Sequence, residues 1–248
     1  MSFIPQTFDT HSIVFSKPRP IAKAPTSCFV NIKALQDGKE EDLTFVTEEL
    51  FCFGVQPTTE LGNAGNVVGY ELGVVLLDPV DSPTPEQAAF VDCLNRIASH
   101  CRQHLLKIKK EIKKPQLIES DLRNFTCVRY AKDKETLEVI PGKSPTLRLR
   151  LYYKNGKISS DFVSNSGRRV DPLTLLGKPI RIRAVIHIRN IFVGNSCALQ
   201  IYAPEIQVQE PPPRRRFFQV SEEDPDEEQA NDQVGNHEYA DNALDLIQ

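Results

Sequence analysis

Two stretches of the sequence alternate basic with aliphatic residues, and this pattern has the clearest chemistry in the chain. In TLRLRLYYK, residues 146–154, leucine stands at positions 147, 149 and 151, and in IRIRAVIHIR, residues 180–189, isoleucine and alanine take every second position. A period of two is typical of a β-strand with one apolar and one polar face. Guanidinium groups bind phosphate oxygens through charge-assisted hydrogen bonds. Neither stretch contains an acid, so the pattern indicates a surface that binds a polyanion.

Aromatic residues lie on or beside these basic strands. Unpaired bases stack on aromatic rings while arginine and lysine neutralise the phosphates, so single-stranded nucleic acid needs both residue types together. Tyr152, Tyr153 and Phe162 are the candidate stacking rings. The candidate cations and polar partners are Arg148, Arg150, Lys154, Lys157, Arg168, Arg169, Arg181, Arg183, His187 and Arg189. The alternative is that these charges only solvate one face of an antiparallel sheet.

Motifs for catalysis are weak. The segment PGKSP, residues 141–145, contains Gly-Lys-Ser, but it lacks the first glycine of a phosphate loop and precedes a strand. His100 and His104 have the i, i+4 spacing of metal ligands, yet no third ligand is evident nearby. The six cysteines are scattered, with no C-x-x-C pair, and are expected to be reduced thiols. We therefore expect no enzyme activity, no cofactor and no metal.

The net charge of −3 combines two opposite parts. The chain has 30 basic and 33 acidic residues, and ten of the acids lie in residues 221–248, which contain no lysine or arginine. The rest keeps 30 bases and 23 acids, a net charge of +7. An anionic segment tethered to a cationic groove would compete with nucleic acid. Its acidic and hydrophobic end is expected to bind partner proteins through Asp241, Leu244, Asp245, Leu246 and Ile247.

The elements that must position these residues are mostly strands. Short runs rich in β-branched and aromatic residues fill residues 27–77 and 125–208. Between them, apolar residues recur every three or four positions from Phe90 to Ile112, which predicts one long helix over about 84–114. Thr84 and Gln87 form a capping-box pattern at its start. Asn155-Gly156 predicts a two-residue hairpin turn.

This order of strands and helix predicts a mainly-β domain. An OB-type Greek-key barrel with extra strands and one inserted helix has the same order of elements. The pattern alone does not distinguish a barrel from a β-sandwich. The expected organisation is an irregular N-terminal arm (1–26), the OB-like domain (27–209), a Pro/Arg linker (210–220) and a disordered acidic tail (221–248).

The stretch VDPLTLLGKPIRIRAVIHIRNIFVGNSCALQIYAPEIQV, residues 170–208, resembles a protein family of nucleocytoplasmic large DNA viruses, notably iridoviruses. That family has been related to the acid-tailed single-stranded-DNA-binding proteins of short-tailed coliphages. The best matched part is roughly 145–208. The resemblance implies an OB-fold that coats single-stranded DNA in replication, with Arg148, Arg150, Arg181 and Arg183 in its groove. It also implies a tail that contacts polymerase, although this tail ends in Leu246, Ile247 and Gln248 rather than an aromatic residue.

The leading hypothesis is therefore a non-catalytic, viral single-stranded-DNA-binding protein. RNA binding and a homodimer remain open, no membrane partner is expected, and the expected location is host cytoplasm or nucleus rather than outside the cell. The main rival is a structural or scaffolding β-protein whose basic face binds an acidic protein.

Overall fold

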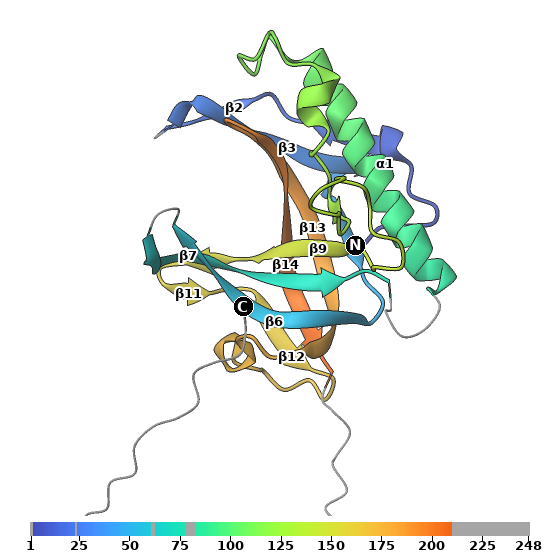
Figure 1. Ribbon diagram of the computed structural model, residues 1–248, viewed down its shortest axis with the longest axis vertical. Helices are drawn as coiled ribbons and strands as arrows, with labels where there is room; N and C mark the ends of the chain where they lie inside the picture. The colour runs from blue at the N-terminus through green and yellow to red at the C-terminus, as the bar shows by residue number, and fades with distance from the viewer. Residues whose placement is uncertain (1, 23, 61–62, 78–82, 210–248) are drawn as a thin grey trace, which may run out of the picture. The chain divides into compact units, whose positions relative to one another are not determined.

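The computed structural model describes residues 2–22, 24–60, 63–77 and 83–209 (Figure 1). Five of its strands close into a ring, so that each of them hydrogen-bonds to two others. These strands are β6 (Leu50–Glu60), β7 (Asn63–Val75), β9 (Thr146–Leu151), β13 (Ile180–Val193) and β14 (Cys197–Val208).

The order around the ring is β6, β7, β9, β14 and β13, and β13 pairs again with β6. In chain order this is first, second, third, fifth and fourth. The β9–β14 pair is parallel and the other four pairs are antiparallel. A five-stranded ring with this connectivity is the OB-type Greek-key barrel. The structure thus confirms the predicted mainly-β OB-type fold.

The alternation that predicted β9 and β13 is seen in their burial. Leu147, Leu149 and Leu151 of β9 are buried, whereas Arg148 and Arg150 between them are exposed. On β13, isoleucine and alanine at alternate positions enter the same hydrophobic core, and the arginines face outward. Burial of the aliphatic face therefore fixes which side of each strand carries the charges.

Further strands extend the sheet along β13 and β14 (Figure 1). Successive segments of β13 pair along one edge with β6, β5 and β3. β12 pairs with β14 in parallel. The strands added to this sheet are β3 (Ala24–Gln36), β4 (Lys39–Asp42), β5 (Thr44–Val46), β8 (Val128–Arg129) and β12 (Asp161–Ser164), of which β4 pairs with β3 and β8 with β9. β10 (Tyr153–Lys154) and β11 (Lys157–Ile158) form a separate two-stranded sheet. There are also three short 3-10 turns in the described residues: η1 (Thr10–Ser12) near the N-terminus, η2 (Glu119–Leu122) before β8, and η3 (Pro172–Leu175) between β12 and β13.

The N-terminal arm is more regular than predicted. Residues 1–26 were expected to be irregular, but they contain β1 (Ile13–Phe15) and β2 (Arg19–Ile21), which both pair with β3. Proline is tolerated on edge strands, because no further strand needs its missing N–H. Pro20 therefore fits β2, and the prolines that suggested irregular structure do not prevent pairing.

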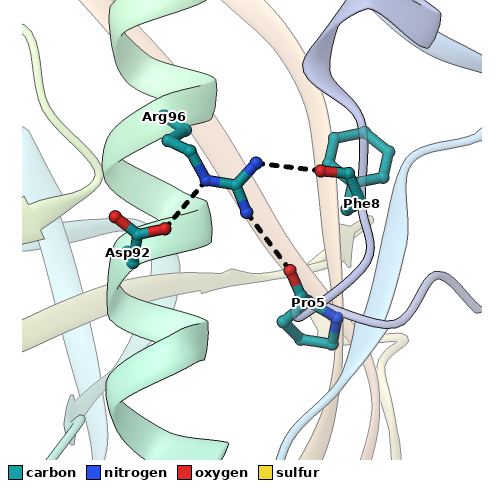
Figure 2. Close-up of polar contacts among 4 residues, drawn as sticks. All are labelled: Pro5, Phe8, Asp92 and Arg96. Carbon is teal, nitrogen blue, oxygen red and sulfur yellow. Dashed lines mark hydrogen bonds and ion pairs between the residues drawn. The ribbon is translucent and has the colours of Figure 1, made fainter.

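Arg96 fixes the start of this arm to the helix (Figure 2). Its Nη1 donates to the carbonyl of Phe8 at 2.9 Å, and its Nη2 donates to the carbonyl of Pro5 at 3.3 Å. Its Nε contacts the carboxylate of Asp92, one turn earlier, at 2.8 Å. The ring of Phe8 packs edge-on against Phe45 with 5.4 Å between centroids. One guanidinium thus joins two backbone carbonyls of the arm to the helix.

The long helix α1 runs from Pro85 to Lys107. Its capping box forms as predicted, with the Thr84 hydroxyl accepting from the backbone N–H of Gln87. The predicted last turns, 108–114, are non-helical turns instead. Lys113 has a positive φ of 57°, and lysines crowd this segment, so like-charge repulsion opposes a continued helix there. No helix in the described ranges is long and apolar enough to cross a membrane.

The hairpin between β10 and β11 forms at Asn155-Gly156. Both residues have positive φ, 52° and 77°, as a type I′ turn requires. The turn places Lys154 opposite Lys157 on the two exposed strand ends.

Candidate nucleic-acid interface

Three polar residues on neighbouring strands form a row across the barrel, of which Arg150 is exposed, Tyr202 is partly buried and His187 is buried. Arg150 of β9 pairs with Tyr202 of β14, and Tyr202 pairs with His187 of β13. Side chains of directly paired residues lie on the same face of a sheet. The row therefore brings a guanidinium, a phenol and an imidazole from three strands to one surface.

A β-bulge directs a second arginine to the same surface. The β13–β14 register shifts between Ile188 and Asn190, which leaves Arg189 as the extra residue. Its guanidinium carbon lies 5.9 Å from the ring centroid of Tyr152 and 5.6 Å from that of Tyr202. Bulges commonly change the direction of a side chain, and here one arginine contacts two aromatic rings.

The two rings beneath Arg189 are held in fixed orientations. Tyr152 and Tyr202 stack with 4.9 Å between centroids and 14° between planes. The Tyr202 hydroxyl donates to Gln200 Oε1 at 3.1 Å, and the Tyr152 oxygen lies 3.1 Å from His187 Nδ1. Burial lowers the pKa of His187, although Asp42 opposes this, and burial raises the pKa of Tyr152. Both groups are therefore neutral near pH 7, and the phenol proton can bridge them.

Two adjoining hollows lie over this row, and together we call them the central groove. The larger, of about 690 Å³, is lined by residues of β2, β3, β13 and β14, and the smaller, of about 250 Å³, by residues of β6, β7, β9, β13 and β14. They share Tyr152, Arg189 and Tyr202. The cations and aromatic residues of the central groove are Arg19, Lys33, Arg150, Arg189, Phe29, Tyr70, Tyr152, Tyr153 and Tyr202. Its acids, within the described residues, are Asp42 and Glu71.

Comparison with known proteins places this chain in a family. A family model described as "Protein of unknown function (DUF2738)" matches residues 6–244. The chain belongs to this family. A curated relative of this DUF2738 chain is the "Early 31 kDa protein" of Frog virus 3 (isolate Goorha), which is 24% identical over 202 residues, covering 79% of this chain and 76% of the relative.

Two solved structures resemble this DUF2738 member weakly. One is gp2.5, a single-stranded DNA binding protein encoded by bacteriophage T7, with a TM-score of 0.40 and 9% identity, over 73% of this chain and 91% of that one. The other is the single-stranded DNA-binding protein of bacteriophage Enc34 in complex with ssDNA, with a TM-score of 0.37 and 10% identity, over 79% and 97%.

The structure brings only part of the predicted residue set into the central groove. Arg150, Tyr152, Tyr153, His187 and Arg189 line it. Tyr153 lies at the edge, where its ring packs edge-on against Tyr70 at 5.4 Å between centroids. Arg150, Tyr152, His187 and Arg189 share the parity of the basic face in the alternating pattern, whereas Tyr153 has the opposite parity.

The other predicted arginines of β9 and β13 do not line the central groove. Arg148 forms an ion pair with Glu71 at 3.1 Å. Arg181 forms one with Glu49 at 3.5 Å, and Arg183 Nε donates to a backbone carbonyl at 3.5 Å. Arg181 and Arg183 lie near the start of β13, far along the strand from the bulge.

The remaining predictions fall elsewhere. Phe162 was predicted to stack on bases, but it is 3% exposed and packs in the core, because alternation along β12 turns it inward. Arg168 and Arg169 lie in the turn after β12, and Lys154 and Lys157 on the exposed hairpin, outside the central groove. The predicted tail contacts, Asp241, Leu244, Asp245, Leu246 and Ile247, lie outside the described residues.

Several lining residues were not among the candidates. Arg19, Phe29 and Lys33 come from β2 and β3, and Tyr70 comes from β7. In CFVNIKA, residues 28–34, polar and aromatic residues alternate with buried Cys28, Val30, Ile32 and Ala34. The same period of two could therefore have indicated Phe29 and Lys33.

His100 and His104, considered as metal ligands, pack against the N-terminal arm. The ring of Phe15 stacks on His104 at 3.8 Å between centroids and on His100 at 5.7 Å. Among the described residues, no group of three or more His, Cys, Asp or Glu could hold a metal ion.

Proposed function

We propose that this protein is a non-catalytic single-stranded-DNA-binding protein and that the central groove holds the strand. The observation that carries the proposal is the stacked pair Tyr152–Tyr202 with Arg189 against both rings, at the junction of the two hollows. Aromatic faces accept any unpaired base, and arginine contributes both charge and cation–π contact. A base stacked on this pair would leave its phosphates near Arg150 and Arg189.

The charge of the central groove supports a polyanionic ligand. Four cations, Arg19, Lys33, Arg150 and Arg189, line it against two acids. If one strand contacts all four, log K should fall with log salt at a slope of about −3, since each neutralised phosphate of a single strand contributes about −0.7. The surrounding residues 1–220 carry the net charge of +7 derived above, which favours the approach of DNA.

The test is a titration of labelled oligo-dT at several salt concentrations. We expect binding with this slope and a preference for single strands over duplex DNA. Arg189→Gln should weaken binding and reduce the slope, whereas the control Arg169→Gln, which removes an arginine outside the central groove, should reduce both much less. No salt-dependent binding by the wild-type protein would overturn the proposal.

The acidic segment extends the proposal. We propose that residues 221–248, with ten acids and no lysine or arginine, compete for the central groove and recruit replication proteins such as a polymerase. Deleting 221–248 should then tighten DNA binding. Unchanged or weaker affinity would contradict the competition.

The frog virus relative supports a role in a virus. We further propose that the protein acts at the replication site of a large DNA virus, in the host cytoplasm or nucleus. The rival function, a scaffolding β-protein with an acidic protein partner, is favoured by the charge of the central groove but does not use its stacked rings. Heparin or duplex DNA competing as well as oligo-dT would favour the rival.

A further inference from the structure

A second basic hollow lies on another part of the barrel domain. It is lined by residues of α1, by the segment 123–132 with β8, and by the first residues of β14, Cys197 to Leu199. Its volume is about 700 Å³, close to the 690 Å³ of the larger hollow in the central groove. We call it the α1/β8 pocket.

The α1/β8 pocket has a strongly positive lining. Its cations are Arg102 on α1, Arg123, Arg129 on β8 and Lys132, and no acid lines it within the described part of the chain. Among the described residues, none of these four cations forms an ion pair with a carboxylate. Burial lowers the pKa of the Arg129 guanidinium, and the nearby charge of Arg148 lowers it further, whereas the charge of Glu71 opposes this shift.

The pocket also offers an aromatic face. Tyr130 is 39% exposed, and its hydroxyl accepts a hydrogen bond from Asn95 Nδ2 at 3.3 Å. This contact from α1 anchors the far end of the ring. The α1/β8 pocket therefore combines an aromatic ring with cations, as the central groove does.

A row of arginines joins the two sites along β9. Arg129 of β8 pairs with Thr146 of β9, and Thr146, Arg148 and Arg150 occupy alternate outward positions. At about 3.3 Å per residue, Thr146 and Arg150 are about 13 Å apart. Arg148 is therefore the link between Arg129 in the α1/β8 pocket and Arg150 in the central groove.

From this arrangement we propose that a single nucleic-acid strand leaves the central groove, passes over Arg148 and enters the α1/β8 pocket. The inference rests on the proposed function and extends the binding path. Arg129, Arg148 and Arg150 follow one another over the paired strands β8 and β9, which suits a linear polyanion. A small anion is instead bound by donors that converge on one point.

The experiment compares a short with a long strand. The double variant R102Q/R129Q removes two charges from the α1/β8 pocket, and the control K109Q/K110Q removes two charges just beyond the end of α1. Affinity is measured for oligo-dT of about 5 and about 16 nucleotides, the range of sites found on one OB-fold. Thermal unfolding confirms that each variant is folded.

We expect R102Q/R129Q to bind the long strand about tenfold more weakly at 0.15 M salt, with a salt slope reduced by about 1.4, because two phosphate contacts are lost. The short strand, which the central groove can hold alone, should bind R102Q/R129Q as tightly as it binds the control K109Q/K110Q.

If R102Q/R129Q and the control bind both lengths equally, the inference fails while the proposed function stands. If the wild-type protein binds neither strand, the proposed function fails as well. Pocket-dependent binding of polyglutamate without an effect on oligo-dT would also overturn the inference.

Discussion

Glu71 is a negative charge inside a site that we propose binds a polyanion, and its removal tests the electrostatics of the central groove. The carboxylate is 19% exposed and lies 3.1 Å from Arg148 Nη1, and its strand partner is Arg150. Glu71→Gln removes the charge, keeps the shape and releases Arg148 from its ion pair. We therefore expect tighter binding of single-stranded DNA.

The size of the effect follows from Coulomb's law. A phosphate about 7 Å from the carboxylate is repelled by about 0.6 kcal/mol in water and by about 2.4 kcal/mol at an effective dielectric constant of about 20. A gain of about 1–2 kcal/mol, or roughly 5- to 30-fold at low salt, is expected, and the salt slope should steepen by up to about 0.7 as Arg148 gains a phosphate. The free energy of unfolding should fall by at most about 1 kcal/mol, since an ion pair near the surface contributes little.

The measurement is fluorescence anisotropy with labelled oligo-dT over a range of salt. Glu49→Gln is the matched control, because it removes the same charge from the ion pair with Arg181, outside the central groove. Equal affinity gains in both variants would show that only net charge matters. Weaker binding by Glu71→Gln would refute the proposed path of the strand.

Three further predictions concern the domain that supports the site. Gly54 has φ +83°, and a Cβ there would lie 2.4 Å from a backbone oxygen. Gly54→Ala should therefore lower the free energy of unfolding, measured by chemical denaturation, by roughly 3 kcal/mol or more. The control Gly38→Ala, at φ +77° in open space, should lower it by only about 1 kcal/mol. Arg96→Met should cost about 2–3 kcal/mol and speed proteolysis of the first residues, because two carbonyls lose a charged donor. Burial and, to a smaller extent, neighbouring charges lower the pKa of His100 and His104, so the unfolded chain binds protons at these residues more tightly than the folded chain. The free energy of unfolding should therefore be highest above about pH 6.5 and fall below it. His104→Phe should make the melting temperature depend less on pH.

The elements that local sequence determines were predicted well. Thr84 and Gln87 lie three residues apart and specify the helix start by direct hydrogen bonds, so their pattern is readable without any fold. Asn155-Gly156 likewise specifies its own turn. The alternation in β9 and β13 reflects burial of one face, and it identified Arg150, Tyr152 and Arg189 correctly as outward-facing.

The assembly of the candidate site could not be predicted in the same way. Arg181 and Arg189 have the same parity on β13, but eight residues separate them, about 26 Å at 3.3 Å per residue, and strands twist over such a length. The bulge that directs Arg189 onto two rings depends on the partner strand and has no local signal. Arg19 and Lys33 reach the site only through pairing of β3 with β13, which joins segments about 160 residues apart.

The closure of the barrel by β13 and β14 also governs when this protein can fold. During synthesis, β6, β7 and β9 emerge from the ribosome long before residues 180–208, and until then two of their edges have no neighbour. Such edges invite pairing with other chains. A nascent chain that stalls before β13 would therefore expose the edges of β6 and β9 to pairing with other chains.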